Sequence, residues 1–278
     1  MRMNAHQIPS PTPAAMFRSF WRNRHLIWQM TRREVTARYR GSVMGLAWSL
    51  INPIIMLIVY TFVFSVIFNA RWQTGENESQ ADFAIILFAG LIVFGLFAEM
   101  VNRAPGQIVS NVNFVKKVVF PLEILSLVTL GSVLFHSLIS LAVLLIGQLI
   151  INQSLPWTAA LFPIVLLPLI FASLGVAWFL AALGVYIRDI GQITTVFTTV
   201  LMFLSAIFYP VSALPEKYQS WLRLNPLVSI IAESRKVLIF GSLPDWSWLG
   251  VSTLIGLGIA FAGFWWFQKT RKGFADVL

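Results

Sequence analysis

The chain has 278 residues, of which 58% are hydrophobic and only 11% are charged. Because soluble domains usually carry about 25% charged residues, this composition excludes a soluble domain and predicts a membrane protein with several spans. The absence of cysteine excludes a disulfide framework and a thiolate metal site. The net charge of +9 does not indicate nucleic-acid binding, because the basic residues cluster beside hydrophobic stretches, as they do on the cytoplasmic side of membrane proteins.

The N-terminal region lacks the pattern of a cleavable signal peptide, which has an apolar stretch soon after its positive start. Residues 7–13 read QIPSPTP, and residues 1–24 are predicted to form a flexible cytoplasmic tail. Between residues 14 and 40, aromatic and aliphatic residues recur near helical spacing among arginines. This pattern predicts an amphipathic helix in the cytoplasmic membrane interface, at about residues 25–40.

Uncharged stretches predict the membrane spans, since a helix needs about 20 mostly apolar residues to cross the hydrocarbon core. Polar residues and proline in NQSLPW (152–157) divide the longest stretch into two spans. The pattern therefore predicts an all-α integral membrane protein with six transmembrane helices, at about residues 43–70, 83–102, 122–151, 158–186, 190–213 and 246–268.

The distribution of lysine and arginine predicts the orientation. Six spans place both termini on one side, and 15 of the 20 Lys and Arg residues lie on that side, against 5 on the other. Because cytoplasmic loops are enriched in these residues, the termini are predicted to be cytoplasmic. The region 209–245 then lies outside, yet LVSIIAESRKVLIF (227–240) is too apolar for a solvated loop. We expect short re-entrant or interfacial helices there, in the outer leaflet before the last span.

The predicted spans contain few groups that could carry chemistry. Glu99 and His136 are functional candidates because they are ionisable and lie in or at the end of a span. Alternatively, Glu99 pairs with Arg103 and His136 is a neutral, hydrogen-bonded residue at a helix contact. The sequence contains no metal-binding motif and no phosphate-binding loop. We therefore expect no metal or cofactor in this chain, and any ATP must be hydrolysed by another chain.

The predicted cytoplasmic loop at about residues 103–121, RAPGQIVSNVNFVKKVVFP, is less polar than a solvated loop. Such a segment suits docking into a groove of another protein, with Phe114 as the anchor and the lysines on the rim. Alternatively, it is a plain loop under the lipid. The next cytoplasmic loop, YIRDIGQ (186–192), is very short, and Arg188 and Asp189 either contact a partner or pair within the chain.

Four ordered segments resemble a known family. They are RREVTARYRGSVMGLAWSLINPIIMLIVYTFVFSVIF (32–68), NVNFVKKVVFPLEIL (111–125), YIRDI (186–190) and FYPVSALPE (208–216). Together they resemble the membrane subunit of bacterial ABC-2-type polysaccharide exporters, the O-antigen and teichoic acid export family. The resemblance runs from about residue 25 to the end, so that 25–278 would form one transmembrane domain.

The resemblance implies a homodimer bound to two copies of a separate ATPase, which holds ATP and Mg. It implies a substrate that is a long glycan on a lipid, commonly a polyprenyl diphosphate, and a location in the inner cell membrane. Residues 111–121 would include the helix that couples the ATPase to the membrane. The implied ATPase contacts are Asn113, Phe114, Lys116 and Lys117, with Arg188 and Asp189 near a second contact.

Two sets of residues fit such a substrate. Arginine suits bidentate phosphate binding, and a cluster at the cytoplasmic entrance consists of Arg32, Arg33, Arg38 and Arg40. Aromatic faces suit the C–H groups of sugars, and the candidates for a glycan conduit are Trp48, Tyr60, Phe62, Phe64, Phe197, Phe203, Phe208 and Tyr209. Alternatively, the arginines only anchor the chain at the cytoplasmic surface, and the aromatic residues face lipid or pack between helices.

Three functions remain open from the sequence. The first is a permease for a lipid-linked polysaccharide of the O-antigen type. The second is an ABC exporter of capsule polysaccharide, teichoic acid, or a small hydrophobic drug or lipid. The third, from another class, is an integral membrane enzyme acting on lipid-linked sugars, which would need a polar catalytic cluster that the sequence does not reveal.

Overall fold

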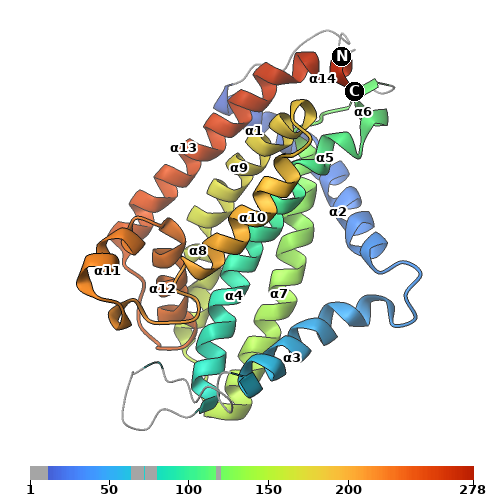
Figure 1. The fold of residues 1–278 in the computed structure, drawn as a ribbon. Helices are drawn as coiled ribbons and strands as arrows, with labels where there is room; N and C mark the ends of the chain where they lie inside the picture. Colours follow the sequence, from blue (N-terminus) through green and yellow to red (C-terminus); the bar gives the residue numbers. More distant parts are fainter. Residues whose placement is uncertain (1–11, 64–71, 73–79, 117–119) are drawn as a thin grey trace.

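The computed structural model describes residues 12–63, 72, 80–116 and 120–278. Within these ranges, all regular structure is helical. In this part of the chain, four helices have 20 residues or more, namely α4 (Gln80–Arg103), α7 (Ile124–Asn152), α9 (Leu167–Tyr186) and α13 (Trp246–Thr270), whereas α3 (Trp48–Tyr60) has 13. Figure 1 shows α4, α7, α9 and α13 side by side along the molecule, with α3 at an angle to them.

Among the described residues, five stretches are long and apolar enough to cross a membrane: Gly45–Val63, Phe83–Arg103, Ile124–Asn152, Trp157–Tyr186 and Trp246–Val277. They correspond to five of the six predicted spans, and α7 ends at Asn152, where the motif NQSLPW predicted a break. A multi-pass membrane protein is thereby supported, whereas the full six-span arrangement is not.

The predicted fifth span, at 190–213, is shorter in the structure. Helix α10 (Ile190–Phe203) has 14 residues, which corresponds to about 21 Å at 1.5 Å per residue. This length is less than the ~30 Å hydrocarbon core. The chain turns after Phe203, and Ala206 adopts a positive φ of 52°, a conformation that ends a helix. Residues 204–213 therefore do not continue α10, although their composition is apolar.

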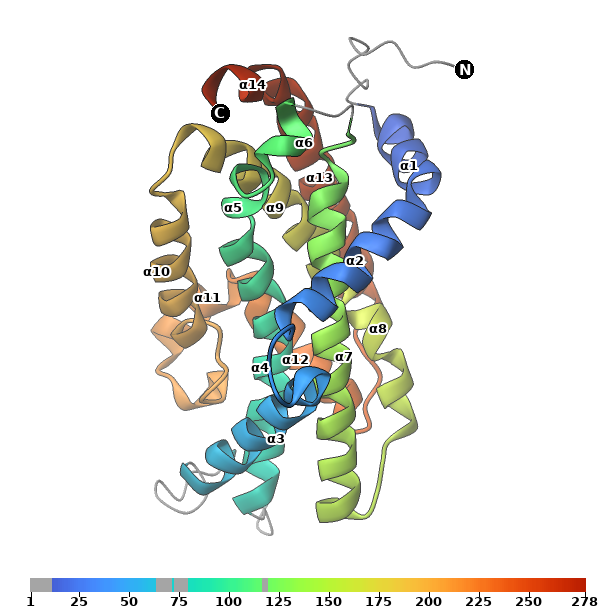
Figure 2. The same cartoon turned by 90° about the vertical axis from the view of Figure 1, so that its right-hand side faces the viewer.

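Helix α4 forms the centre of the molecule. Of the five apolar stretches, the one in α4 is the most buried and the one that contains α3 is the least buried. Figure 2 shows α4 between α10 and α7, with α2 (Arg24–Arg38) and α3 in front. A residue that changes the packing of α4 therefore affects most of the bundle.

Helices α9 and α13 pack closely through glycines. A Cβ atom added to Gly263 of α13 would collide with the carbonyl oxygen of Gly175 of α9. A Cβ atom at Gly256, two turns earlier, would lie 2.7 Å from the carbonyl oxygen of Pro168. Small residues let helix backbones approach in membranes, where tight packing replaces the hydrophobic effect between helices.

Short helices gather at one end of the molecule. They are α1 (Pro13–Arg22), α5 (Gly106–Val109), α6 (Val112–Lys116), the 3₁₀ turn Arg271–Gly273 and α14 (Phe274–Val277). Figure 1 shows α1, α5, α6 and α14 near one another and near the turn between α9 and α10. Residues 13–22, which belong to the predicted N-terminal tail, form α1, and Phe20 of this helix stacks on Trp178 at a centroid distance of 5.7 Å.

The region predicted to be re-entrant contains short helices. They are the 3₁₀ turn Val211–Ala213, α11 (Glu216–Arg223) and α12 (Pro226–Leu238). Helix α12 packs against α4, α8 (Phe162–Val165) and the 3₁₀ helix Trp157–Leu161, and Ile231 and Val237 are fully buried. This burial explains why residues 227–240 are too apolar for a solvated loop. Helix α13 then begins after Asp245, which accepts hydrogen bonds from the backbone N–H groups of Ser247 and Trp248.

Candidate functional site

A cluster of ion pairs connects α2 to α4 near the end that carries the short helices. Arg38 of α2 donates to Glu99 of α4 at 2.7 Å, and Arg103 donates to the same carboxylate oxygen at 3.3 Å. Arg103 also forms an ion pair with Glu34 of α2. The predicted alternative that Glu99 pairs with Arg103 is confirmed. The structure shows that Glu99 also pairs with Arg38, which the sequence did not predict. In this cluster, the charges of Glu34 and Glu99 offset those of Arg38 and Arg103.

Tyr39 and His136 extend this cluster. The Tyr39 hydroxyl lies 3.4 Å from Nδ1 of His136, and the rings meet edge to face. Burial raises the pKa of Tyr39 above its ordinary value, so the phenol stays protonated and can donate this hydrogen bond. Nε2 of His136 is buried without a hydrogen-bond partner among the described residues. His136 of α7 thus contacts the C-terminal end of α2.

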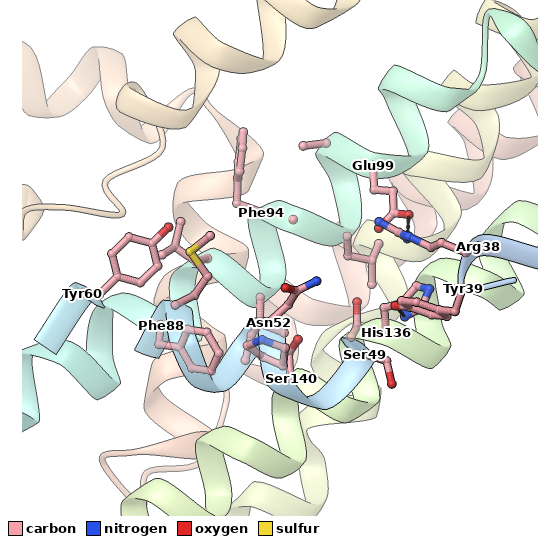
Figure 3. A pocket seen from close by; sticks show the side chains of 18 residues that line it. Arg38, Tyr39, Ser49, Asn52, Tyr60, Phe88, Phe94, Glu99, His136 and Ser140 are labelled. Carbon is pink, nitrogen blue, oxygen red and sulfur yellow. Dashed lines mark hydrogen bonds and ion pairs between the residues drawn. The ribbon is translucent and has the colours of Figure 1, made fainter. Parts of the chain in front are cut away.

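A cavity of about 360 Å³ lies between α3, α4 and α7. Figure 3 shows Arg38, Tyr39, Glu99 and His136 at one end of it, and Tyr60 and Phe88 toward the other. Further polar groups come from α3 and α7, namely Ser49, Asn52, Ser137 and Ser140. The cavity therefore combines charged, hydroxyl, amide and aromatic groups, as sites for polar organic ligands do.

A second cavity, of about 670 Å³, adjoins the same ion pairs. It is lined by Glu34, Arg38, Glu99, Asn102, Arg103 and Ser132. Arg38 and Glu99 line both cavities. The Arg38–Glu99 ion pair therefore lies where the two cavities adjoin.

The structure disperses the four arginines predicted to bind a lipid diphosphate. Arg38 is paired with Glu99, as described above. Arg33 and Arg40 line a hollow of about 310 Å³ with Thr36 and Ala37. Arg32 is exposed on α2 and lines none of these three cavities. Arg33 and Arg40 are therefore the pair best placed to bind one anionic group together.

The described residues of the predicted conduit lie in two parts of the chain, on or just after α3 and on or just after α10. Tyr60 lines the cavity between α3, α4 and α7. Phe203 stacks on Phe208 at a centroid distance of 5.5 Å, and the Tyr209 hydroxyl donates to the Phe203 carbonyl at 2.8 Å. The others are elsewhere: Trp48 is half-buried, Phe62 and Phe197 are exposed, and Phe64 lies outside the described residues.

The predicted ATPase contacts lie at the end that carries the short helices. Asn113 and Lys116 are exposed on α6, whereas Lys117 lies outside the described residues. The Phe114 ring is half-buried and stacks on Phe120, with centroids 4.3 Å apart and an interplanar angle of 11°. Phe114 therefore fixes α6 to its own chain, and the neighbouring polar side chains face outward.

The second predicted contact lies close to the first. Arg188 and Asp189 are exposed in the turn between α9 and α10. Near this turn, a Cβ atom added to Gly184 of α9 would collide with the carbonyl oxygen of Pro105. Because Pro105 directly precedes α5, the α5–α6 segment and this turn are held together at the same end of the molecule.

Arg235 is a buried residue whose role the sequence did not reveal. From α12 it donates hydrogen bonds to the carbonyl oxygens of Ile86 (3.0 Å), Ala206 (3.0 Å) and Ile207 (2.8 Å). Its guanidinium also lies 4.3 Å from the Trp72 ring centroid. Arg235 therefore connects α12 to α4 and to the turn that ends α10. The available signal was one arginine inside an apolar run, but its carbonyl partners are distant in sequence.

Among the described residues, no group of three or more histidine, aspartate or glutamate side chains could hold a metal ion.

Residues 25–239 match the family model of the ABC-2 type transporter. The chain is 27% identical over 263 residues to the O-antigen export system permease protein RfbA of Myxococcus xanthus, covering 94% of this chain and 98% of the relative. It is 26% identical over 247 residues to the polysialic acid transport protein KpsM of Escherichia coli, covering 83% and 88%. It is also 26% identical over 226 residues to the capsule polysaccharide export inner-membrane protein CtrC of Neisseria meningitidis, covering 76% and 79%.

Proposed function

Because the chain belongs to the ABC-2 type transporter family, we propose that it is the permease subunit of an ATP-driven exporter of a lipid-linked polysaccharide of the O-antigen type. Family membership confirms the resemblance read from the motifs, and it makes the chain a membrane subunit of a transporter rather than an enzyme. The observation that carries the proposal is the match to an O-antigen export permease over 94% of this chain and 98% of the relative.

The cavities and cations support a substrate with an anionic head and a sugar chain. Arg33 and Arg40 share an exposed hollow, and two guanidinium groups can each donate two hydrogen bonds to a phosphate. The larger cavity beside Glu99 and Asn102 and the smaller one beside Asn52 and Ser140 provide groups that hydrogen-bond to hydroxyls. A diphosphate would bind at the hollow while the sugars occupy these cavities.

The protein works as a homodimer with two copies of an ATPase that binds ATP and Mg. The exposed Asn113 and Lys116, and the exposed Arg188 and Asp189 near them, form the docking surface for this ATPase. In this arrangement the end that carries α1, α5, α6 and α14 faces the cytoplasm, and the spans cross the inner membrane.

Capsule polysaccharide is the second candidate substrate, because two of the three relatives described above are named for polysialic acid transport and capsule polysaccharide export. The O-antigen export relative is matched over a larger share of both chains, and for this reason we place it first.

The experiment that tests the proposal combines purification and export. The tagged chain is isolated in mild detergent with its bound proteins, and the chain is expressed in a strain whose own polysaccharide exporter has been deleted. We expect co-purification of an ATPase and restored surface polysaccharide that depends on ATP hydrolysis by that partner.

A matched pair of variants locates the docking surface. Lys116→Glu on α6 should reduce the amount of ATPase that co-purifies, because it reverses a charge on the proposed surface. Lys217→Glu, on the exposed α11 outside this surface, should leave it unchanged. A chain that purifies without any ATPase and restores no polysaccharide would contradict the proposed function.

A further inference from the structure

A buried carboxylate lies between the proposed docking segment and the rest of the bundle. Glu123, which directly precedes α7, is 1% exposed. One carboxylate oxygen accepts a hydrogen bond from the Ser19 hydroxyl at 2.7 Å. The other accepts one from Nη1 of Arg271 at 2.8 Å. Ser19 lies on α1, and Arg271 directly follows α13, so this single side chain connects three parts of the chain.

Arg271 makes a second hydrogen bond to the residues that precede α7. Its Nη2 donates to the carbonyl oxygen of Phe120 at 2.6 Å, and the Phe120 ring is the one on which Phe114 of α6 stacks. The guanidinium therefore holds both the backbone and the carboxylate of the stretch between α6 and α7. Because both terminal nitrogens of the planar guanidinium donate hydrogen bonds, they fix the orientation of Arg271 as well as its distance from the segment.

Helix α9 also contacts this junction. Nε1 of Trp178 donates to the backbone carbonyl of Glu123 at 2.9 Å. The Trp178 ring is fully buried, stacks on Phe20 of α1 and meets Phe264 of α13 edge to face. Polar and aromatic contacts thus converge on Glu123 from α1, α9 and α13.

These contacts form a stiff connection. A buried carboxylate is costly to leave without its partners, so a movement of the stretch before α7 must either carry Arg271 and Ser19 with it or break the ion pair. Apolar burial by itself is non-directional, whereas hydrogen bonds weaken steeply when their geometry changes. The charged hydrogen bonds restrict the segment to a fixed position relative to α13.

We propose that Glu123 and Arg271 are positioning residues that transmit movement of the docking segment α5–α6 to the last span and to α1. The inference rests on the proposed function, since it assumes that an ATPase pushes on this segment. It adds a specific path, in which the segment acts through Phe120 and Glu123 on Arg271 at the end of α13 and on Ser19 of α1.

The test uses the full permease–ATPase complex with Glu123→Gln and Arg271→Gln as separate variants. Three quantities are measured: the ATPase bound per permease, the rate of ATP hydrolysis, and the polysaccharide exported per ATP hydrolysed. We expect the first two to stay within about twofold of the unmodified protein. Export per ATP should fall about tenfold or more, within the range typical of coupling between distant sites.

The chain offers matched controls for these variants. Lys272→Gln removes an exposed charge next to Arg271 and should export normally. Arg271→Lys keeps the charge but cannot hydrogen-bond to Glu123 and Phe120 through two separate nitrogens. Its export per ATP should lie between that of the unmodified protein and that of Arg271→Gln. Arg271 is partly exposed, with 23% of its side-chain surface accessible, so its variants decide the question if Glu123→Gln does not fold.

Two results would overturn the inference. Unchanged export per ATP in Arg271→Gln would show that the ion pair transmits no movement. A parallel loss of bound ATPase, hydrolysis and export in both variants would show that the pair serves only to hold the fold together. If the unmodified chain itself recruits no ATPase, the proposed function fails, and the coupling path fails with it.

Discussion

At the scale of single residues, the Arg38–Glu99 pair is a contact that both cavities of the candidate site share. It joins α2 to α4, and its two members line both polar cavities. Arg38 is about half exposed, so solvent screens the attraction, and such pairs contribute at most about 1 kcal/mol. Such a weak pair can break at little cost when α2 moves relative to α4.

Glu99→Gln should therefore open the smaller cavity to the cytoplasmic side. Because the chain has no cysteine, a single Asn52→Cys substitution reports on this cavity. We expect its labelling by a charged maleimide to become up to about fivefold faster, the change that about 1 kcal/mol produces. The measurement uses inside-out vesicles and a time course of labelling.

Glu34→Gln is the matched control, because Glu34 pairs with Arg103 and leaves the Arg38–Glu99 pair intact. Its labelling rate should equal that of Asn52→Cys alone. Equal acceleration by both glutamate substitutions would mean that general loosening of α2, rather than this ion pair, controls access.

At the scale of secondary-structure elements, the contact between α9 and α13 depends on glycine. The collision predicted for a Cβ atom at Gly263 involves the backbone carbonyl of Gly175, which cannot rotate away as a flexible side chain can. The two helices would have to separate, and the displaced packing would extend to Trp178 and Phe264. The same helices contact the Glu123 junction, so their spacing also matters for the proposed path.

Gly263→Ala should lower the apparent melting temperature in detergent, because overpacking a tight contact costs about 1–3 kcal/mol. Gly258→Ala on the same helix is the control: nothing lies within 4 Å of an added Cβ atom there, and alanine favours the helix. This control should melt at the same temperature as the unmodified protein or higher. Equal melting temperatures for the two variants would contradict the close contact between α9 and α13.

At the scale of the whole molecule, the two ends differ in charge and in structure. Lys and Arg residues are concentrated on the side of the termini, with 15 of 20 placed there by the predicted spans. The helices α1, α5, α6 and α14 gather at one end (Figure 1), whereas α12 leads into α13 toward the other. The distribution of Lys and Arg predicts that the end with α1, α5, α6 and α14 faces the cytoplasm.

Cysteine labelling in spheroplasts tests this orientation. A membrane-impermeant maleimide should label Ser242→Cys, between α12 and α13, without permeabilisation. It should label Lys272→Cys, beyond α13, only after the membrane is opened. Both positions are exposed in the structure, so burial does not explain a difference, and the reverse labelling pattern would contradict the cytoplasmic placement of the termini.

The sequence by itself determined the membrane class, the position of five apolar spans and the break after Asn152. These features depend on local composition: long apolar stretches indicate the spans, and proline with polar residues indicates the break. It also pointed to the family through motifs that lie in order along the chain. The length of α10 could not be predicted, because the turn at Ala206 is stabilised by Arg235, which lies 29 residues away.

Only the tertiary structure decided which charges are paired. Arg38 meets Glu99 across 61 positions, and Arg271 meets Glu123 across 148. In the sequence, Arg38 is one of several arginines before the first span, and Glu123 is one acid in an apolar motif. Local patterns predict that a helix forms and how much of it is apolar, but pairing depends on how distant helices pack. The Arg38–Glu99 pair and the proposed coupling path therefore arise from packing alone.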